Sequence, residues 1–281
     1  MLTRTTTSLF AAALFFSLFS FSTTSIAAEY TLAIQPILPQ KELRENFQPL
    51  ADYLSKMTGD TITITTQRNF LFYWTKMRKR KHGFDLVLDA AHFTDYRVKT
   101  QGYTVLAKLP DTVSFSIVTG EDNLLFDVEE LIGQRVATMP SPSLGSLRLE
   151  ELFSNPMRIP HYVWETNTTI AMENLIAGKI DAAIIPTRIA SKYNNINVLL
   201  TTEPVPHMAL SASPDVPAET AEKIRTAIIN AHLHPDGKAM LQRLKVNQFE
   251  PANNQTYDGY ALLLKEVFGY DGPIAQAKSD P

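Results

Sequence analysis

The sequence contains 281 residues, of which 44% are hydrophobic and 20% are charged, and it has no cysteine. This length supports one large or two medium domains with a packed core. The absence of cysteine excludes disulfides, thiolate metal sites and cysteine nucleophiles. With 26 basic and 29 acidic residues, the net charge of -3 gives no general attraction to nucleic acid or anionic lipid.

Residues 1–28 have the pattern of a secretory signal peptide. Arg4 is their only charged residue, an apolar run follows it, and small residues at the end resemble a cleavage site. The apolar run is shorter than the ~20 residues that a membrane-spanning helix needs. We therefore expect cleavage after Ala27 or Ala28 and a periplasmic mature protein without stable membrane insertion.

After this segment, short β-rich runs alternate with helical patterns. In chain order the first elements are a strand at 30–34, a helix at 43–57, a strand at 61–65, a helix at 70–77 and a strand at 84–88. Strand–helix–strand order predicts a mainly parallel sheet with right-handed crossovers. A basic run at 76–81 falls at a helix end without an aromatic stacking platform, so it does not indicate nucleic-acid binding.

The second half of the chain repeats this scheme and then changes. Strands are expected at 113–119, 135–139, 161–164, 180–185 and 207–211, and helices at 128–133, 147–153, 168–176, after Pro217, near 238–244 and near 257–268. Because the last helices have no strand-rich unit of their own, they must cover the first sheet.

These elements predict an α/β clamshell of two lobes with two interlobe crossovers and a ligand in the cleft. The first lobe is expected to be discontinuous, from 29–115 and 207–270, and the second to span 116–206. Residues 271–281 are polar and contain proline and glycine, which is typical of a flexible tail.

Several segments, taken together, resemble one protein family. The segments 47–59, 83–85, 140–145, 177–183 and 206–217 are similar in order and spacing to those of the periplasmic solute-binding proteins of phosphonate, phosphite and phosphate ABC transporters. The resemblance covers nearly all of residues 30–268. It implies a type II periplasmic binding fold that closes on a small ligand and delivers it to a permease, but it does not imply which ligand.

The sequence departs from this family where ligands are held. The family's phosphonate binders carry a Ser-Thr-Ser-Gly turn before a helix, whereas this chain has Pro142-Ser143-Leu144-Gly145. Ser143 matches, and Ser141 and Ser146 stand nearby as substitutes. These hydroxyls and the helix N-terminus either bind an anion, or Ser143 only caps the helix.

A second departure follows the strand at 84–88. Where the family has Ser-Tyr, this chain has Phe93-Thr94, and Asp89 and His92 are additions. Asp89 would repel a phosphonate in the cleft, so either it caps a helix or the ligand also carries a positive group. His92 is either a ligand contact or a partly buried histidine bonded to the backbone.

The remaining candidate contacts are aromatic or amide side chains near strand ends. Four aromatic residues open the second helix: Phe70, Phe72, Tyr73 and Trp74. At least one of these rings is expected to face the cleft, and the candidate contacts among them are Phe72 and Tyr73. The other candidates are Gln35, Trp164, Asn167 and Thr168. Together with Asp89, His92 and Thr94, they fit either a phosphonate-like oxyanion or a small organic zwitterion.

We expect no catalysis, no cofactor and no metal site. The sequence has no Gly-x-Ser-x-Gly, Ser-x-x-Lys or His-Glu-x-x-His motif. His232 and His234 are two residues apart, so they lie on different faces of a helix. We expect a monomer that serves an ABC permease. The alternative is a clamshell that reports its occupied state to a membrane receptor or kinase, and a hydrolase ranks third.

Overall fold

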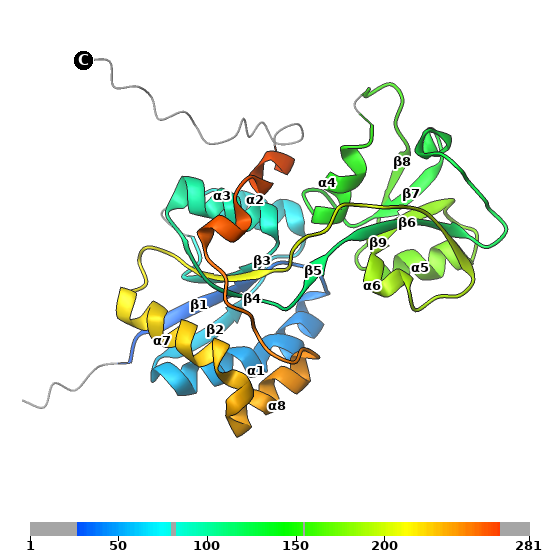
Figure 1. Ribbon diagram of the computed structural model, residues 1–281. Helices are drawn as coiled ribbons and strands as arrows, with labels where there is room; N and C mark the ends of the chain where they lie inside the picture. The colour runs from blue at the N-terminus through cyan, green and yellow to red at the C-terminus, as the bar shows by residue number, and fades with distance from the viewer. Residues whose placement is uncertain (1–26, 80–82, 154, 265–281) are drawn as a thin grey trace, which may run out of the picture.

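The computed structural model describes residues 27–79, 83–153 and 155–264. The predicted signal segment 1–28 lies almost entirely outside these residues, and the predicted tail 271–281 lies wholly outside them. Two five-stranded sheets lie side by side, and each forms one lobe with its helices (Figure 1). The two-lobed α/β architecture expected from the sequence is confirmed.

The first sheet combines strands from both ends of the described chain. In sheet order its strands are β2 (Thr61–Thr65), β1 (Glu29–Ile34), β3 (Leu86–Asp89), β12 (Ala209–Ala212) and β4 (Thr104–Lys108). β1 is parallel to β2 and β3, whereas β12 is antiparallel to β3 and β4. β12 comes after every strand of the second sheet in the chain, so the first sheet is assembled from two separate stretches of sequence.

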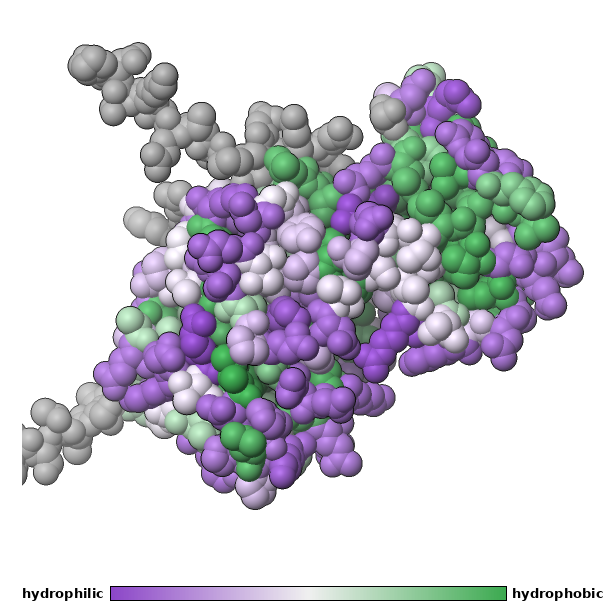
Figure 2. All heavy atoms as spheres, viewed as in Figure 1, coloured by the Kyte–Doolittle hydropathy of each residue, from purple (hydrophilic) through white to green (hydrophobic). Residues whose placement is uncertain are grey.

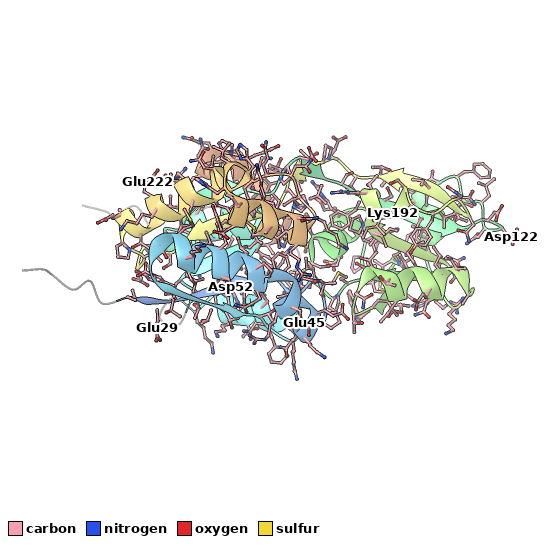
Figure 3. All side chains as sticks on the ribbon, turned by 90° about the horizontal axis from the view of Figure 1, so that it is seen from below. Glu29, Glu45, Asp52, Asp122, Lys192 and Glu222 are labelled. Atoms are coloured by element: carbon pink, nitrogen blue, oxygen red, sulfur yellow. The ribbon has the colours of Figure 1, made fainter. Side chains whose placement is uncertain are left out.

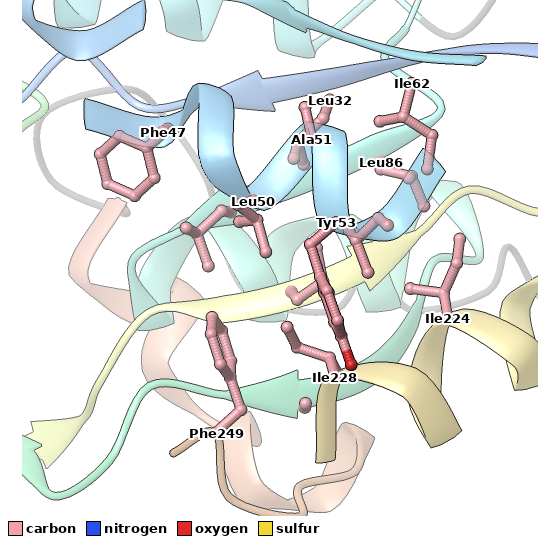
Figure 4. Close-up of a cluster of buried hydrophobic side chains, with 14 of the residues drawn as sticks. Leu32, Phe47, Leu50, Ala51, Tyr53, Ile62, Leu86, Ile224, Ile228 and Phe249 are labelled. Carbon is pink, nitrogen blue, oxygen red and sulfur yellow. The ribbon is translucent and has the colours of Figure 1, made fainter. Parts of the chain in front are cut away.

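Helices cover both faces of the first sheet because its strands bury both sets of alternating side chains. Leu32 and Ile34 pack beneath α1 (Gln40–Thr58), α7 (Ala218–Ile229) and α8 (Pro235–Leu244), whereas Ala33 faces α2 (Phe70–Met77) and α3 (Ala91–Gln101). Figure 4 shows the first of these two clusters. In it, the Tyr53 hydroxyl donates to the Ala227 carbonyl at 2.9 Å, which satisfies the one polar atom of that ring.

The periodicity of α1 explains its position. Its buried residues Leu43, Phe47, Leu50 and Leu54 recur every three or four positions and form one apolar face. The helix ends at Gly59, whose φ of 81° permits the left-handed cap, and its N–H donates to the Ser55 carbonyl.

The C-terminal region differs from the sequence expectation. Instead of one helix near 257–268, the structure has two 3₁₀ turns, η4 (Asn254–Tyr257) and η5 (Tyr260–Leu264), after the short η3 (Ala231–Leu233). Gly259, with a φ of 94°, separates η4 from η5.

The predicted strand at 207–211 begins later, at Ala209, because the N–H of Met208 donates to Nδ1 of His207 instead of a neighbouring strand.

The second sheet comes from one continuous stretch of chain. In sheet order its strands are β10 (Ile196–Thr201), β6 (Phe115–Gly120), β9 (Ala182–Pro186), β7 (Arg135–Thr138) and β8 (His161–Trp164). Its helical elements are η2 (Val128–Leu131), α4 (Leu144–Glu150), α5 (Thr168–Ile176) and α6 (Thr187–Ala190). α5 and α6 cover one face, and α4 and η2 cover the other.

The two crossovers between the lobes are paired with each other. β5 (Thr112–Val113) and β11 (Val205–Pro206) form a two-stranded antiparallel ribbon (Figure 1). The predicted strand at 113–119 is therefore divided between β5 in the ribbon and β6 in the second sheet.

The second lobe exposes hydrophobic side chains. Figure 2 shows hydrophobic surface over the region of β7 and β8, and the second lobe also exposes Phe126 and Met157. Charged side chains such as Glu45, Asp52 and Lys192 point outward in Figure 3. Within the described ranges, none of the helices combines the length and apolar character required to cross a membrane.

Candidate functional site: the interlobe cleft

A cavity of about 580 Å³ lies between the lobes, and we call it the interlobe cleft. The first lobe contributes residues at the carboxyl ends of β1 and β3 and the start of α2, and the second lobe contributes the first turns of α4, α5 and α6. The crossover ribbon forms its base. Carboxyl ends of strands and N-termini of helices meet here, which is where open α/β sheets bind ligands.

Four predicted contacts line this cleft: Gln35, Ser143, Asn167 and Thr168. Gln35 is buried, and both ends of its amide are engaged. Its Nε2 donates to the Met208 sulfur at 2.9 Å, and its Oε1 accepts the Ala90 N–H at 3.1 Å. Gln35 therefore links β1 to two other parts of the cleft wall.

The serine turn before α4 is satisfied internally. The Ser143 hydroxyl donates to the Met139 carbonyl at 3.0 Å and accepts the Ser146 N–H at 3.2 Å, so it caps the helix. The Ser146 hydroxyl donates to the Ser143 carbonyl at 2.9 Å. Neither Ser146 nor Ser141 lines the cleft, and Ser141 lies beside Glu150.

An aromatic ring lies against the same turn. A Cβ placed on Gly145 would lie 3.1 Å from the Phe115 ring, so this ring packs directly on the backbone of the first turn of α4. A side chain at position 145 would make this contact tighter than usual, so the glycine favours the close approach.

The first turn of α5 remains open to the cleft. Asn167 caps the helix by accepting the Ile170 N–H at 3.1 Å, while Thr168 and Thr169 line the cavity. The first N–H groups of a helix have no partner within the helix, and they carry a partial positive charge.

Three predicted contacts instead form a buried polar cluster with Arg97. The Asp89 carboxylate accepts from the Tyr73 hydroxyl at 2.7 Å, the Thr94 hydroxyl at 3.1 Å and Arg97 Nε at 3.1 Å. All four side chains are fully buried, and none lines the cleft. Burial raises the pKa of Asp89, and Arg97 opposes that rise.

His92 connects the two lobes. Its Nε2 lies 3.0 Å from the Pro142 carbonyl in the loop before α4, and because a carbonyl only accepts, Nε2 carries the hydrogen. Burial lowers the pKa of His92 to about 3, so the ring is neutral. His92 therefore contacts the second lobe directly but does not line the cleft.

Phe72 and Trp164 lie outside the cleft and are exposed. The Arg68 guanidinium lies 3.5 Å from the centre of the Phe72 ring, and Trp164 lies beside Tyr162 at 5.8 Å between ring centres. Consecutive residues of a helix point about 100° apart, which buries Tyr73 and leaves Phe72 in solvent.

Three charged or titratable residues of the cleft were not identified from the sequence: Asp111, Arg188 and His207. Arg188 is the second residue of α6, directly after the buried strand β9. The usual position of ligand contacts after strand ends was the signal that could have identified it. Asp111 and His207 belong to the loops that flank the crossover ribbon, where local sequence patterns are weak.

His207 presents a neutral ring to the cleft. Burial, together with the positive charges of Lys108 and Arg188, lowers its pKa to about 4. Its Nδ1 accepts the Met208 N–H at 2.8 Å, so the hydrogen of the neutral ring lies on Nε2. Arg188 is therefore the cation of the described cleft lining at neutral pH, and Asp111 is its carboxylate.

Glu150 of α4 should make stability depend on pH. Burial raises its pKa from 4.5 to about 7, so between these values the folded protein holds a proton that the unfolded chain has lost. Stability should therefore fall as pH rises from 4.5 to 7. Because the side chain is only partly buried, we expect a loss of about 1 kcal/mol.

The test is thermal unfolding of Glu150→Gln at pH 5 and pH 8. The variant should gain stability over the parent protein at pH 8 and little at pH 5. Glu151→Gln, at the exposed neighbouring position, serves as the control. An equal effect of Glu150→Gln at both pH values would contradict the assignment.

Within the described ranges, three or more histidine, aspartate or glutamate side chains do not cluster in a way that could hold a metal ion. The described lining of the cleft thus combines mainly apolar surface with hydroxyls, helix N-termini and one pair of opposite charges.

The fold and the cleft define a two-lobed ligand-binding protein of the type II periplasmic class. The model of one family, described as the periplasmic substrate-binding protein of the phosphonate ABC transporter, matches residues 32–257. The chain belongs to this family, whose members are periplasmic and bind small ligands for ABC permeases. No curated protein matches the sequence.

Solved structures agree with this fold. PhnD1 from Prochlorococcus marinus, in complex with methylphosphonate, has a TM-score of 0.70 at 15% identity, covering 85% of this chain and 98% of its own. A Xanthomonas citri protein bound to ATP has a TM-score of 0.68 at 13% identity, covering 86% and 100%. A binding protein component of an ABC phosphonate transporter from Pseudomonas aeruginosa has a TM-score of 0.67 at 12% identity, covering 85% of each chain.

Proposed function

We propose that this chain binds a small organic ligand with an oxyanionic group in the interlobe cleft and delivers it to an ABC permease. The observation that carries the proposal is Arg188. Arg188 lines the cleft, and its guanidinium forms no hydrogen bond or ion pair with any other described residue. A cation in that situation is available to pair with an anionic ligand.

Neighbouring groups from both lobes support the same ligand chemistry. Thr168 and Thr169 place hydroxyls in the cleft beside the N-terminus of α5. His207 adds a neutral ring whose Nε2–H can donate. The ligands named for the Prochlorococcus and Xanthomonas structures, methylphosphonate and ATP, both carry phosphorus oxyanions.

The proposal extends to the whole chain. Export would use residues 1–28 as a cleavable signal, and the mature protein would act as a monomer without catalysis. The lobes would divide at the crossover ribbon, with 29–115 and 207–270 in the first lobe, 116–206 in the second and 271–281 as a tail. The paired strands β5 and β11 support this division because they lie between the two sheets.

Replacing Arg188 should weaken oxyanion binding. Charged hydrogen bonds contribute about 1.5–3 kcal/mol, so Arg188→Ala should raise the Kd for the best oxyanion by about 10- to 100-fold. Titration calorimetry measures this change, after a thermal-shift screen of phosphonates, phosphate, phosphite, carboxylates and amines has identified that ligand.

Lys192→Ala is the matched control because Lys192 is an exposed cation of the same lobe outside the cleft. It should leave the Kd unchanged. A screen in which amines stabilise the protein and no oxyanion does so would overturn the proposed function.

A further inference from the structure

One part of the first-lobe wall of the interlobe cleft, formed by Ile37, Leu38, Phe70 and Met208, is apolar. Gln35 lies in the same wall, and its amide nitrogen and oxygen are engaged by Met208 and Ala90. The other polar residues of the first lobe line the cleft in or beside the crossover ribbon: Asp111, Thr112, Ser114 and His207. A ligand group that lies against the apolar part of this wall loses its hydrogen bonds to water and gains few from the protein. Burying an apolar group there is favourable, whereas burying a charged one is costly.

The serine turn offers little to a small oxyanion. The hydroxyl hydrogens of Ser143 and Ser146 are donated to backbone carbonyls. The Phe115 ring lies against Gly145 and lines the cleft beside this turn. Two of the three hydroxyls that could hold the oxygens of a bare phosphonate, those of Ser143 and Ser146, are therefore already engaged within the protein, and the third residue, Ser141, does not line the cleft.

The size and charge of the cleft favour larger ligands over the smallest ones of the same chemistry. The cleft of about 580 Å³ falls in the range of ~300–1,000 Å³ that is usual for drug-sized molecules, whereas methylphosphonate has only a single methyl group beside its phosphonate. The described lining holds the cation Arg188 and the carboxylate Asp111. One cation opposed by one carboxylate favours a head group of low charge over a dianion.

From these observations we propose that the ligand is an oxyanion with an apolar substituent of about three carbons or more. Its head lies against Arg188 and the threonines of α5, and its substituent lies against Leu38 and its neighbours on the first-lobe wall. This inference rests on the proposed function and deepens it, because it assigns the two ends of the ligand to the two lobes.

The test is calorimetric titration of the full mature chain with two matched series. Methyl-, n-butyl- and phenylphosphonate form one series, and acetate, pentanoate and benzoate form the other. Each buried methylene adds about 0.8 kcal/mol, or up to ~4-fold in affinity. We therefore expect the n-butyl compound to bind about 10- to 60-fold more tightly than the methyl compound in the series whose head group fits.

Two variants separate the wall from general stability. Leu38→Ser should bring the ratio of n-butyl to methyl affinity close to one and leave binding of the methyl compound within about twofold. Leu124→Ser, an exposed leucine outside the cleft, should keep the parent ratio. Circular dichroism confirms that both variants are folded.

The outcomes separate this inference from the proposed function. An affinity that rises with substituent size in either series supports the inference, and the series in which it rises identifies the head group. Methylphosphonate or phosphate binding as tightly as the larger compounds would overturn the inference while the proposed function stands. Binding of n-butylammonium in place of every oxyanion would overturn both.

Discussion

Asp89→Ala should destabilise the protein by about 3–5 kcal/mol. The substitution removes the carboxylate that faces Arg97 Nε at 3.1 Å, and both side chains are fully buried. The guanidinium would remain among the rings of Tyr73, Phe84 and Tyr103 without a counter-charge. Breaking a buried pair by removing one partner has this cost because the remaining charge is neither hydrated nor paired. Chemical denaturation measures the difference.

A double variant distinguishes the unpaired charge from lost packing. Asp89→Leu combined with Arg97→Met removes both charges and should recover much of the stability, because an apolar pair of similar volume often replaces a buried ion pair without loss. A single variant that keeps its stability but loses ligand affinity would instead support the sequence-based interpretation of Asp89 as a ligand contact.

Leu147→Ala should lower the free energy of unfolding by about 2–5 kcal/mol. It should also disturb packing in the first lobe. Leu147 belongs to α4 of the second lobe, but it is buried in a cluster with Phe70, Tyr73 and Trp74 of the first lobe. Truncating a buried leucine removes its transfer free energy and leaves a cavity. Here the cavity would open between the lobes, next to the interlobe contact of His92 with Pro142.

The two tryptophans of the chain make this effect measurable. In a Trp164→Phe background, the remaining Trp74 reports on the first lobe, and Leu147→Ala should change its native emission. Leu175→Ala truncates a leucine within the second lobe's own core and should lower stability without changing that emission. An unchanged Trp74 signal in Leu147→Ala would contradict the shared core.

The order of elements was predictable because periodicity and glycine caps are local. Gly59 ends α1, and strand–helix alternation indicates the parallel strands.

β4 and β10 were not predicted. Both pair antiparallel with their sheet neighbours and are not followed directly by a helix, so the alternating scheme did not require them. The C-terminal 3₁₀ turns depend on tertiary contacts, such as the Ala261 N–H that donates to the buried Asp95.

The part of the site that could be predicted from the sequence consists of residues that follow predicted strands. Gln35, Asn167 and Thr168 follow strands and line the cleft. Asp89 also ends a strand, but its carboxylate turns inward because Arg97 lies two helical turns along α3, a pairing that sequence spacing does not reveal. Arg188 follows β9 in the same way as Asn167 follows β8, yet it lies on a helix of four residues that has no periodic pattern to mark it.

The position of β12 constrains how the chain can acquire its structure. β12 lies between β3 and β4, although about a hundred residues of sequence separate it from either. These two strands cannot complete their hydrogen bonding until residues 209–212 arrive. The intervening stretch, 115–201, contains every strand of the second sheet. The middle of the sequence can therefore form its sheet without the last segment, whereas one edge of β3 and one edge of β4 stay unpaired until that segment arrives.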